Sequence, residues 1–406
     1  MTWVTVERWS GWVLLLGGTM RGEPMRVRVV TVLAALALLA GAASGAAAAG
    51  PREATAPVPI EVGAAIDYVA LGDSYTAGPL VPVPTPGPLG CVRSSSNYPA
   101  FLAAYLQVRT FADVSCSAAR TEHLFASQPG ILPQGLPENQ NAPQLLAVTA
   151  ETDLVTLGIG GNDFGLFGEL IDSCADLAAE HPEADAPCRD SFTTDGVDTK
   201  LRDAAAIQGH VEQALAAIVE RAPDATVVVV GYLHILPEEG TCAAVPFAPG
   251  DYAWGTQVHQ ALNASLSRAA EAYGASYVDM YAASVGRDAC AAEPWVNGEQ
   301  IRADAFSYHP FRSGMKGIAD AVFRQLTDDV PNPFALPLLQ LVKRLPALVD
   351  VDGLLGYVAA GGSVPPQVLE DAEAPAAPAA ASPALLTNIA ALLAGLESAP
   401  PTSPAG

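Results

Sequence analysis

The most informative stretch of the sequence is residues 66–76, which read IDYVALGDSYT. Its first six residues form a short apolar run typical of a buried β-strand, and Gly72-Asp73-Ser74 follows directly. A serine just past the end of a strand lies at the carboxyl edge of a sheet, where open α/β folds bind their ligands. The competing interpretation is a turn serine that hydrogen-bonds its own backbone. The Gly-x-Ser-x-Gly pentapeptide of the α/β-hydrolases does not occur in the chain.

Strand-like and helix-like segments alternate after this stretch. Strands are expected at 110–115, 153–159, 225–231 and 275–279, and helices at 98–106, 142–149, 199–221, 252–273 and 312–326. Strands that are apolar on both faces are typical of a parallel sheet covered by helices on both sides. The alternation predicts one three-layer αβα domain over residues 64–330.

The two ends of the chain differ from this domain. A basic start at residues 25–28, an apolar run at 29–39 and small residues at 41–50 predict a secretory signal peptide over 1–49. The alternative is an uncleaved membrane anchor, and residues 1–24 could belong to an over-extended reading frame. Residues 331–406 are rich in alanine and proline, which predicts a partly disordered tail.

The charge of the chain narrows the choice of partners. The formal net charge is −23, and an acidic surface repels phosphate backbones, so nucleic acid is not expected as a partner. Contact with a membrane is expected only through the tail or an uncleaved signal, and the protein is expected to be a monomer. The sequence has no His-Glu-x-x-His motif and no Walker-type phosphate loop. We therefore expect neither a metal nor a cofactor.

Six cysteines follow the signal segment: Cys91, Cys116, Cys174, Cys188, Cys242 and Cys290. An even number of cysteines behind an export signal indicates disulfides in an oxidising compartment. Six cysteines allow 15 connectivities, of which pairing between neighbours along the chain is the simplest. Buried free thiols are the alternative.

Two further clusters carry candidate catalytic groups. Gly160-Gly161-Asn162-Asp163 follows the third expected strand, and the Asn162 amide could donate to a developing oxyanion beside Ser74. A left-handed turn would account for the same residues. His309 lies ahead of Pro310 and of an expected helix. A serine hydroxyl is a weak nucleophile until a base takes its proton, and His309 is the candidate base.

The three clusters together resemble the GDSL/SGNH hydrolases over residues 64–328, and segments such as 93–99 and 294–298 are similar to the secreted bacterial lipase and esterase branch. The resemblance implies a flavodoxin-like, five-stranded parallel sheet and three sequential disulfides. It also implies an oxyanion hole formed by the backbone N–H groups of Ser74 and Ala118 and by the side chain of Asn162.

Two positions depart from the family pattern. Ala118 stands where the family usually has glycine, which would strain an alanine if the backbone there has positive φ. Phe306 stands where the family commonly has an aspartate that orients the histidine. Two acceptors could replace that aspartate for His309: the main-chain carbonyl of Phe306, which we favour, or the carboxylate of Asp304.

The sequence therefore predicts a secreted serine ester hydrolase, a lipase or esterase acting on an ester or lipid substrate through Ser74 and His309. The segments 79–90 and 164–170, expected to be loops, carry apolar residues suited to an acyl chain. A carbohydrate acetyl esterase or an acyltransferase could use the same residues. The alternative from a different functional class is a non-catalytic binding protein that has the same fold.

Overall fold

The computed structural model describes residues 59–129 and 140–331. The predicted signal peptide and, apart from Pro331, the predicted tail lie outside these residues. In the described parts of the chain, no helix is long and apolar enough to cross a membrane.

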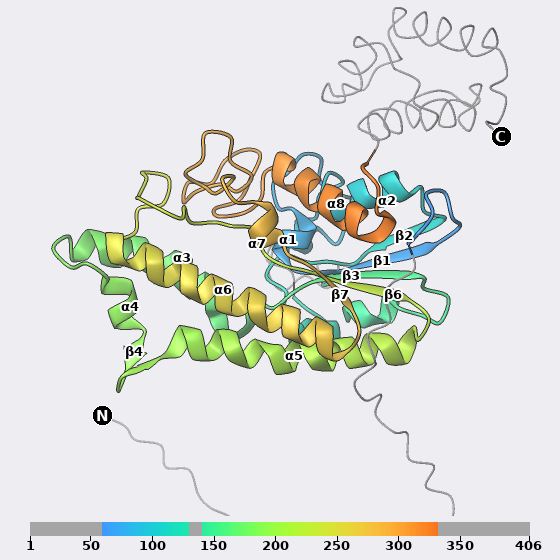
Figure 1. Cartoon of the computed structure of the whole chain (residues 1–406), viewed down its shortest axis with the longest axis horizontal. Coiled ribbons are helices and arrows are strands. Elements are labelled where there is room, and N and C mark those ends of the chain that lie inside the picture. Colours follow the sequence, from blue (N-terminus) through green and yellow to red (C-terminus); the bar gives the residue numbers. More distant parts are fainter. Residues whose placement is uncertain (1–58, 130–139, 332–406) are drawn as a thin grey trace, which may run out of the picture. The chain divides into compact units, whose positions relative to one another are not determined.

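The centre of the domain is a sheet of five parallel strands in the order β2-β1-β3-β6-β7 (Figure 1). The strands are β1 (Asp67–Gly72), β2 (Thr110–Asp113), β3 (Leu154–Gly158), β6 (Thr226–Val230) and β7 (Ser276–Val278). Gly72 pairs with Gly158 at the carboxyl ends of β1 and β3, so the two motifs that follow these strands meet at one edge. The sequence prediction of a three-layer α/β fold with a five-stranded parallel sheet is confirmed.

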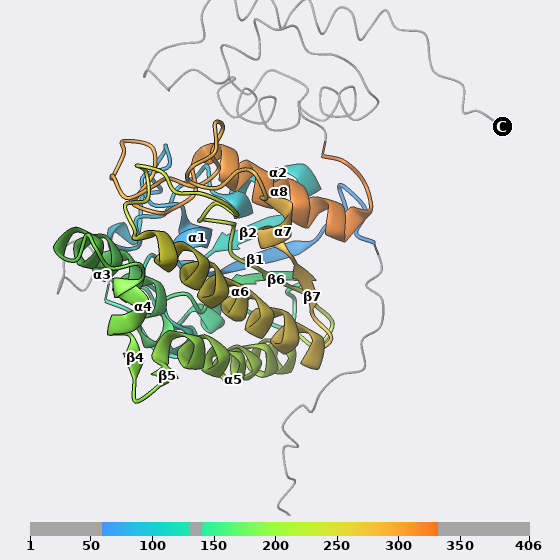
Figure 2. The same cartoon turned by 60° about the vertical axis from the view of Figure 1, so that its left-hand side comes forward.

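Long helices cover both faces of the sheet. Helices α2 (Tyr98–Leu106) and α8 (Arg312–Thr327) pack together on one face, and α5 (Thr199–Arg221) and α6 (Pro249–Ala272) pack together on the other (Figures 1 and 2). The sheet between them is buried on both sides, and every residue of β3 is buried. Short helices are α1 (Ser74–Ala77), α4 (Pro187–Ser191) and α7 (Met280–Ala283).

The structure corrects two expected segments. Residues 142–149 form only a short 3-10 turn, Gln144–Ala147, which begins after Pro143. Residues 164–170 are not a loop, because α3 (Leu166–Glu180) begins within them. Leu166, Leu170 and Cys174 recur every fourth residue and form the buried face of α3.

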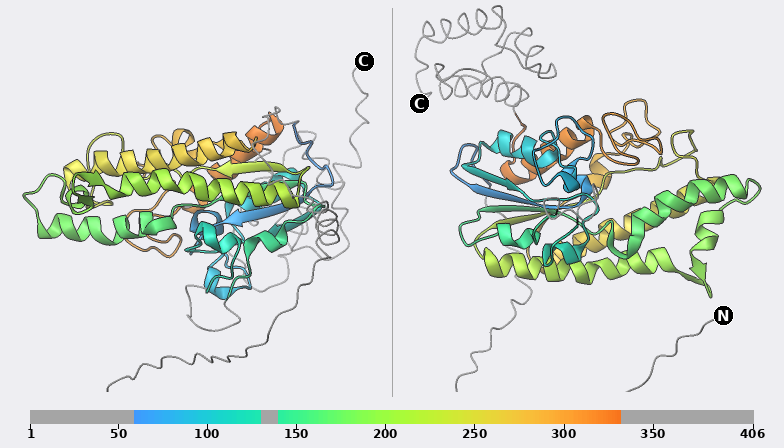
Figure 3. Two further views of the ribbon diagram at one scale, coloured as in Figure 1. Left: turned by 90° about the horizontal axis from the view of Figure 1, so that it is seen from below. Right: turned by 180° about the vertical axis from the view of Figure 1, so that it is seen from behind.

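After α3 and α4 the chain forms a small antiparallel hairpin that was not predicted from the sequence. Its strands are β4 (Thr193–Thr194) and β5 (Val197–Asp198). With α3 and α4, the hairpin extends past the end of the sheet (Figure 3).

Three disulfides connect neighbouring cysteines along the chain: Cys91–Cys116, Cys174–Cys188 and Cys242–Cys290. The structure records no free cysteine in the residues that it describes. The sequential pairing is therefore confirmed. The second bridge ties α3 to α4, and the first holds the segment after β2 against residues 89–93.

Candidate active site

The turn after β1 presents the serine of the opening motif. Asp73 caps α1, and its side chain accepts a hydrogen bond from the Tyr75 N–H at 2.9 Å. A Cβ atom on Gly72 would lie 2.2 Å from Thr76 Oγ1 and 2.6 Å from the Gly158 carbonyl oxygen, so only glycine fits there. The turn is thus tightly packed, and it places the largely buried Ser74 at the carboxyl edge of the sheet.

His309 comes from the long segment between α7 and α8 and reaches the same edge. Its Nε2 lies 2.7 Å from Ser74 Oγ. Its Nδ1 lies 2.6 Å from the main-chain oxygen of Ser307. Because a carbonyl only accepts, Nδ1 carries the proton, and the lone pair of Nε2 is left to accept the hydroxyl proton of Ser74.

The group that accepts from His309 Nδ1 is the Ser307 carbonyl, so the sequence prediction of the Phe306 carbonyl or the Asp304 carboxylate was wrong. The Phe306 carbonyl is engaged elsewhere, since it accepts hydrogen bonds from Asn297 Nδ2 at 3.0 Å and from the His309 N–H at 3.2 Å. Asp304 is about half exposed and pairs with Arg302. Neither replaces the missing aspartate, because the Ser307 carbonyl already holds Nδ1.

Burial of the imidazole controls its protonation. It lowers the pKa of His309 to about 4, while the bond to the Ser307 carbonyl opposes this effect in part. Removal of an imidazolium from water is unfavourable, so the neutral form is favoured. At neutral pH His309 is therefore unprotonated at Nε2, the state that a general base needs.

The backbone at the second predicted oxyanion residue is strained. Ala118 has φ +62°, in the left-handed region that favours glycine. Among the described residues, no acceptor pairs with the N–H of Ala118 or with that of Ser74. Strained backbone with an unpaired donor is typical of functional sites. Ala118, Ser74 and Asn162 all line one cleft, so the structure brings the three predicted donors together.

Asn162 also connects two loops of the site. Its Nδ2 donates to the Ala119 carbonyl at 3.0 Å, which leaves the second N–H of the amide available. In return, Asp163 accepts hydrogen bonds from the backbone N–H of Thr121 at 2.8 Å and from its hydroxyl at 2.5 Å. The loops of Ala118 and Asn162 are therefore bonded to each other from both sides.

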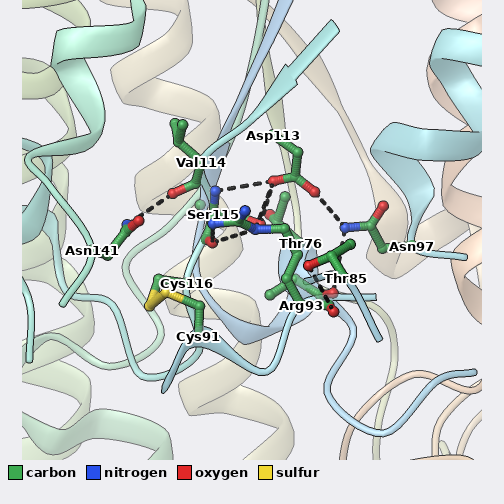
Figure 4. Close-up of polar contacts among 12 residues, drawn as sticks. Thr76, Thr85, Cys91, Arg93, Asn97, Asp113, Val114, Ser115, Cys116 and Asn141 are labelled. Carbon is green, nitrogen blue, oxygen red and sulfur yellow. Dashed lines mark hydrogen bonds and ion pairs between the residues drawn. A yellow bond between two sulfur atoms is a disulfide. The ribbon is translucent and has the colours of Figure 1, made fainter. Parts of the chain in front are cut away.

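A buried polar network supports the Ala118 loop (Figure 4). Asp113, at the end of β2, accepts from Asn97 Nδ2 at 2.6 Å and from the backbone and hydroxyl of Ser115. Arg93 lies 3.5 Å from Asp113 and donates twice to the Ser115 carbonyl, at 2.8 and 2.6 Å. Together with the bridge at Cys116, these bonds fix the chain just before Ala118.

The cleft above Ser74 has a volume of about 560 Å³ and mostly apolar walls. Apolar side chains around it include Leu80, Phe167, Leu170, Leu236, Phe247 and Trp254. The expected acyl segments 79–90 and 164–170 each contribute residues to these walls. The sequence did not predict that Trp254 of α6 and the segment around Leu236 also line the cleft. In the sequence alone, their apolar residues look the same as residues of the hydrophobic core. Of the residues predicted as catalytic, oxyanion-hole or histidine-orienting groups, only Asp304 lies outside the cleft lining.

The model of the GDSL-like lipase/acylhydrolase family matches residues 70–316. The chain belongs to this family. It is 35% identical to Lipase 2 of Streptomyces coelicolor over 301 residues, which cover 73% of this chain and 95% of that protein. The family member described here is therefore a carboxylic ester hydrolase of the lipase/esterase type.

Solved structures agree with this membership. Phospholipase A1 from Streptomyces albidoflavus is 28% identical, with a TM-score of 0.51, and the match covers 65% of this chain and 98% of that one. The extracellular lipase from Streptomyces rimosus is 29% identical, with a TM-score of 0.51, and the match covers 64% of this chain and 98% of that one. The domain of this GDSL-family member thus corresponds to nearly the whole of each of those chains.

The described residues contain no group of three or more histidine, cysteine, aspartate or glutamate side chains placed to hold a metal ion.

Proposed function

We propose that this protein is a secreted serine ester hydrolase that cleaves lipid esters through an acyl-enzyme on Ser74. The observation that carries the proposal is the 2.7 Å contact between Ser74 Oγ and Nε2 of His309, at the base of an apolar cleft. A hydroxyl in contact with a neutral, partly buried imidazole is an activated nucleophile.

The first half of the reaction forms the acyl-enzyme. Ser74 Oγ attacks the ester carbonyl carbon while its proton passes to Nε2 of His309. The N–H groups of Ser74 and Ala118 and the free N–H of Asn162 stabilise the oxyanion. The tetrahedral intermediate then expels the alcohol, whose oxygen takes the proton from Nε2 as the carbon–oxygen bond breaks.

The second half releases the acid. Water attacks the acyl carbon, its proton passes to Nε2, and collapse of the intermediate returns that proton to Ser74 Oγ. The Ser307 carbonyl accepts from Nδ1 throughout and keeps the imidazole in one tautomer. The pair is therefore a Ser–His dyad with a main-chain carbonyl in place of the third side chain.

The walls of the cleft support an acyl chain as the group bound beside Ser74. Leu80, Phe167, Leu170 and Trp254 offer apolar surface and few donors for a sugar. The relative from Streptomyces albidoflavus is a phospholipase A1, which makes a phospholipid a reasonable ester to test. A carbohydrate acetyl esterase would be expected to line this region with polar groups.

Secretion is supported by three separate observations. The sequence predicts a signal peptide over residues 1–49, and three disulfides indicate an oxidising compartment. The relative from Streptomyces rimosus is an extracellular lipase. We propose that the mature enzyme acts outside the cell.

A panel of nitrophenyl esters of increasing chain length tests the proposal, together with a phospholipid and an acetylated sugar. We expect hydrolysis of the nitrophenyl esters, loss of all activity in a folded Ser74→Ala variant, and labelling of Ser74 by a serine-reactive phosphonate. Ser276→Ala in β7 is the control and should keep full activity. Activity in Ser74→Ala, labelling at another residue, or hydrolysis of the acetylated sugar alone would overturn the proposal.

A further inference from the structure

Two buried tyrosines lie between the three loops that carry the proposed catalytic groups. Tyr75 follows Ser74 in α1, and Tyr232 follows β6. Their rings meet edge to face with 5.1 Å between centroids, and both side chains are buried against the cleft. Burial of a tyrosine hydroxyl is unfavourable without a hydrogen-bond partner, so the partners of the two hydroxyls reveal what this pair does.

The hydroxyl of Tyr232 connects the turn of Ser74 to the loop of Asn162. It donates to Asp73 Oδ2 at 2.5 Å and accepts from the Gly161 N–H at 2.7 Å. Asp73 and Gly161 each directly precede a proposed catalytic residue. A single hydroxyl therefore sets the spacing between the nucleophile and the amide donor of the oxyanion hole.

The hydroxyl of Tyr75 connects the same turn to the loop of His309. It donates to the Tyr308 carbonyl at 2.5 Å, and its ring centroid lies 5.2 Å from that of the imidazole. Tyr308 has a left-handed backbone, with φ +55°. The bond thus holds the chain at the bend that directs His309 toward Ser74.

We infer that Tyr75 and Tyr232 are positioning residues, which hold the Ser74 turn, the Asn162 loop and the His309 loop in their reactive arrangement. This inference rests on the proposed function, because it assigns the tyrosines a role through those three residues. Neither hydroxyl has to touch the substrate. A displacement of about 1 Å in such a constellation lowers the rate by about 100-fold, and loss of one oxyanion donor lowers kcat by about 10²–10³-fold.

Tyrosine-to-phenylalanine variants separate this role from packing, because they keep the ring and remove only the hydroxyl. Tyr68→Phe is the matched control. Tyr68 is equally buried, its hydroxyl bonds Thr156 Oγ1 at 2.7 Å, and it lies in β1 away from the cleft lining. Tyr68→Phe and Tyr75→Phe each lose one buried hydrogen bond, and Tyr232→Phe loses two.

With a soluble nitrophenyl ester, we expect Tyr232→Phe and Tyr75→Phe each to lower kcat by about 10–100-fold with KM within about twofold of the parent. We expect phosphonate labelling of Ser74 to slow in parallel. Tyr68→Phe should keep kcat within about twofold, although it loses as many hydrogen bonds as Tyr75→Phe. A Tyr232→Phe enzyme with parental kcat, or an equal fall in Tyr68→Phe, would overturn the inference.

A double-mutant cycle tests whether Tyr232 acts through the Asn162 loop. If it does, Tyr232→Phe should lower kcat far less in an Asn162→Ala background than in the parent, because the donor that it positions is already absent. Equal effects in both backgrounds would contradict that route. The Ser74→Ala variant is assayed in the same experiment so that the two proposals can fail separately. Activity retained in Ser74→Ala would refute the proposed function, whatever the result for the tyrosine variants.

Discussion

The main-chain oxygen of Ser307 holds the imidazole of His309, at 2.6 Å from Nδ1. A carbonyl fixes the tautomer as a carboxylate does, but it carries no charge with which to stabilise the imidazolium that forms during the reaction. It also belongs to the backbone, so no side-chain substitution removes it. The behaviour of variants around His309 should therefore differ from that of a complete Ser–His–Asp triad.

Asp304→Asn should keep most of the activity, with a loss well under about tenfold in kcat/KM. Asp304 is about half exposed and pairs with Arg302 rather than with the imidazole. Steady-state kinetics on a nitrophenyl ester measures the effect, and circular dichroism checks that the variant folds. Replacement of a true triad aspartate by asparagine lowers kcat by about 10⁴-fold in serine proteases. A loss of that size here would show that Asp304 orients His309.

Activity should persist well into acid conditions. Burial lowers the pKa of His309 to about 4, and the imidazole is protonated, and so inactive as a base, only below its pKa. A lowered pKa thus extends the active range downward, and kcat/KM should fall by half near pH 4. The measurement is the pH profile of kcat/KM, with folding monitored at each pH. An acid limb near the ordinary histidine pKa of about 6.5 would contradict the lowered pKa of His309.

Ala118→Gly should stabilise the protein while activity is kept. An alanine at φ +62° is strained by about 1–2 kcal/mol, and glycine relieves this strain but loses more backbone entropy on folding, by about 0.5–1 kcal/mol. We expect a net gain of up to about 1.5 kcal/mol in the free energy of unfolding, measured with denaturant. The control Ala103→Gly, in the interior of α2, should lose about 1 kcal/mol instead. Equal losses in both variants would show that Ala118 is not strained.

The sequence could predict those parts of the site that follow from motifs at strand ends. Ser74 and Asn162 come directly after β1 and β3, and the pairing of Gly72 with Gly158 brings these ends together. The apolar strands likewise predicted the parallel sheet, because continuous apolar strands are typical of a sheet that is covered on both faces.

The acceptor for His309 could not be predicted, because every residue carries a carbonyl. Which carbonyl reaches Nδ1 depends on the left-handed bend at Tyr308, which has no sequence signature. The start of α3 was missed for a local reason. Phe164 and Gly165 have positive φ, and Gly168 weakens the helical pattern, although Leu166, Leu170 and Cys174 keep the spacing of a buried helix face.

The acyl-chain preference should shift when the cleft is narrowed at Gly168. This residue of α3 lines the cleft, and a Cβ atom there would meet nothing within 4 Å, so a larger side chain can be added without a clash. Gly168→Phe should therefore lower kcat/KM for long-chain nitrophenyl esters by about tenfold or more, because apolar contacts in such a pocket are worth about 1–3 kcal/mol per methylene. The acetate ester, which needs none of that space, should be hydrolysed at nearly the parental rate. Gly209→Phe in α5 is the matched control, since its Cβ also meets open space but outside the cleft lining, and its chain-length profile should equal that of the parent. An unchanged profile in Gly168→Phe would place the acyl chain elsewhere.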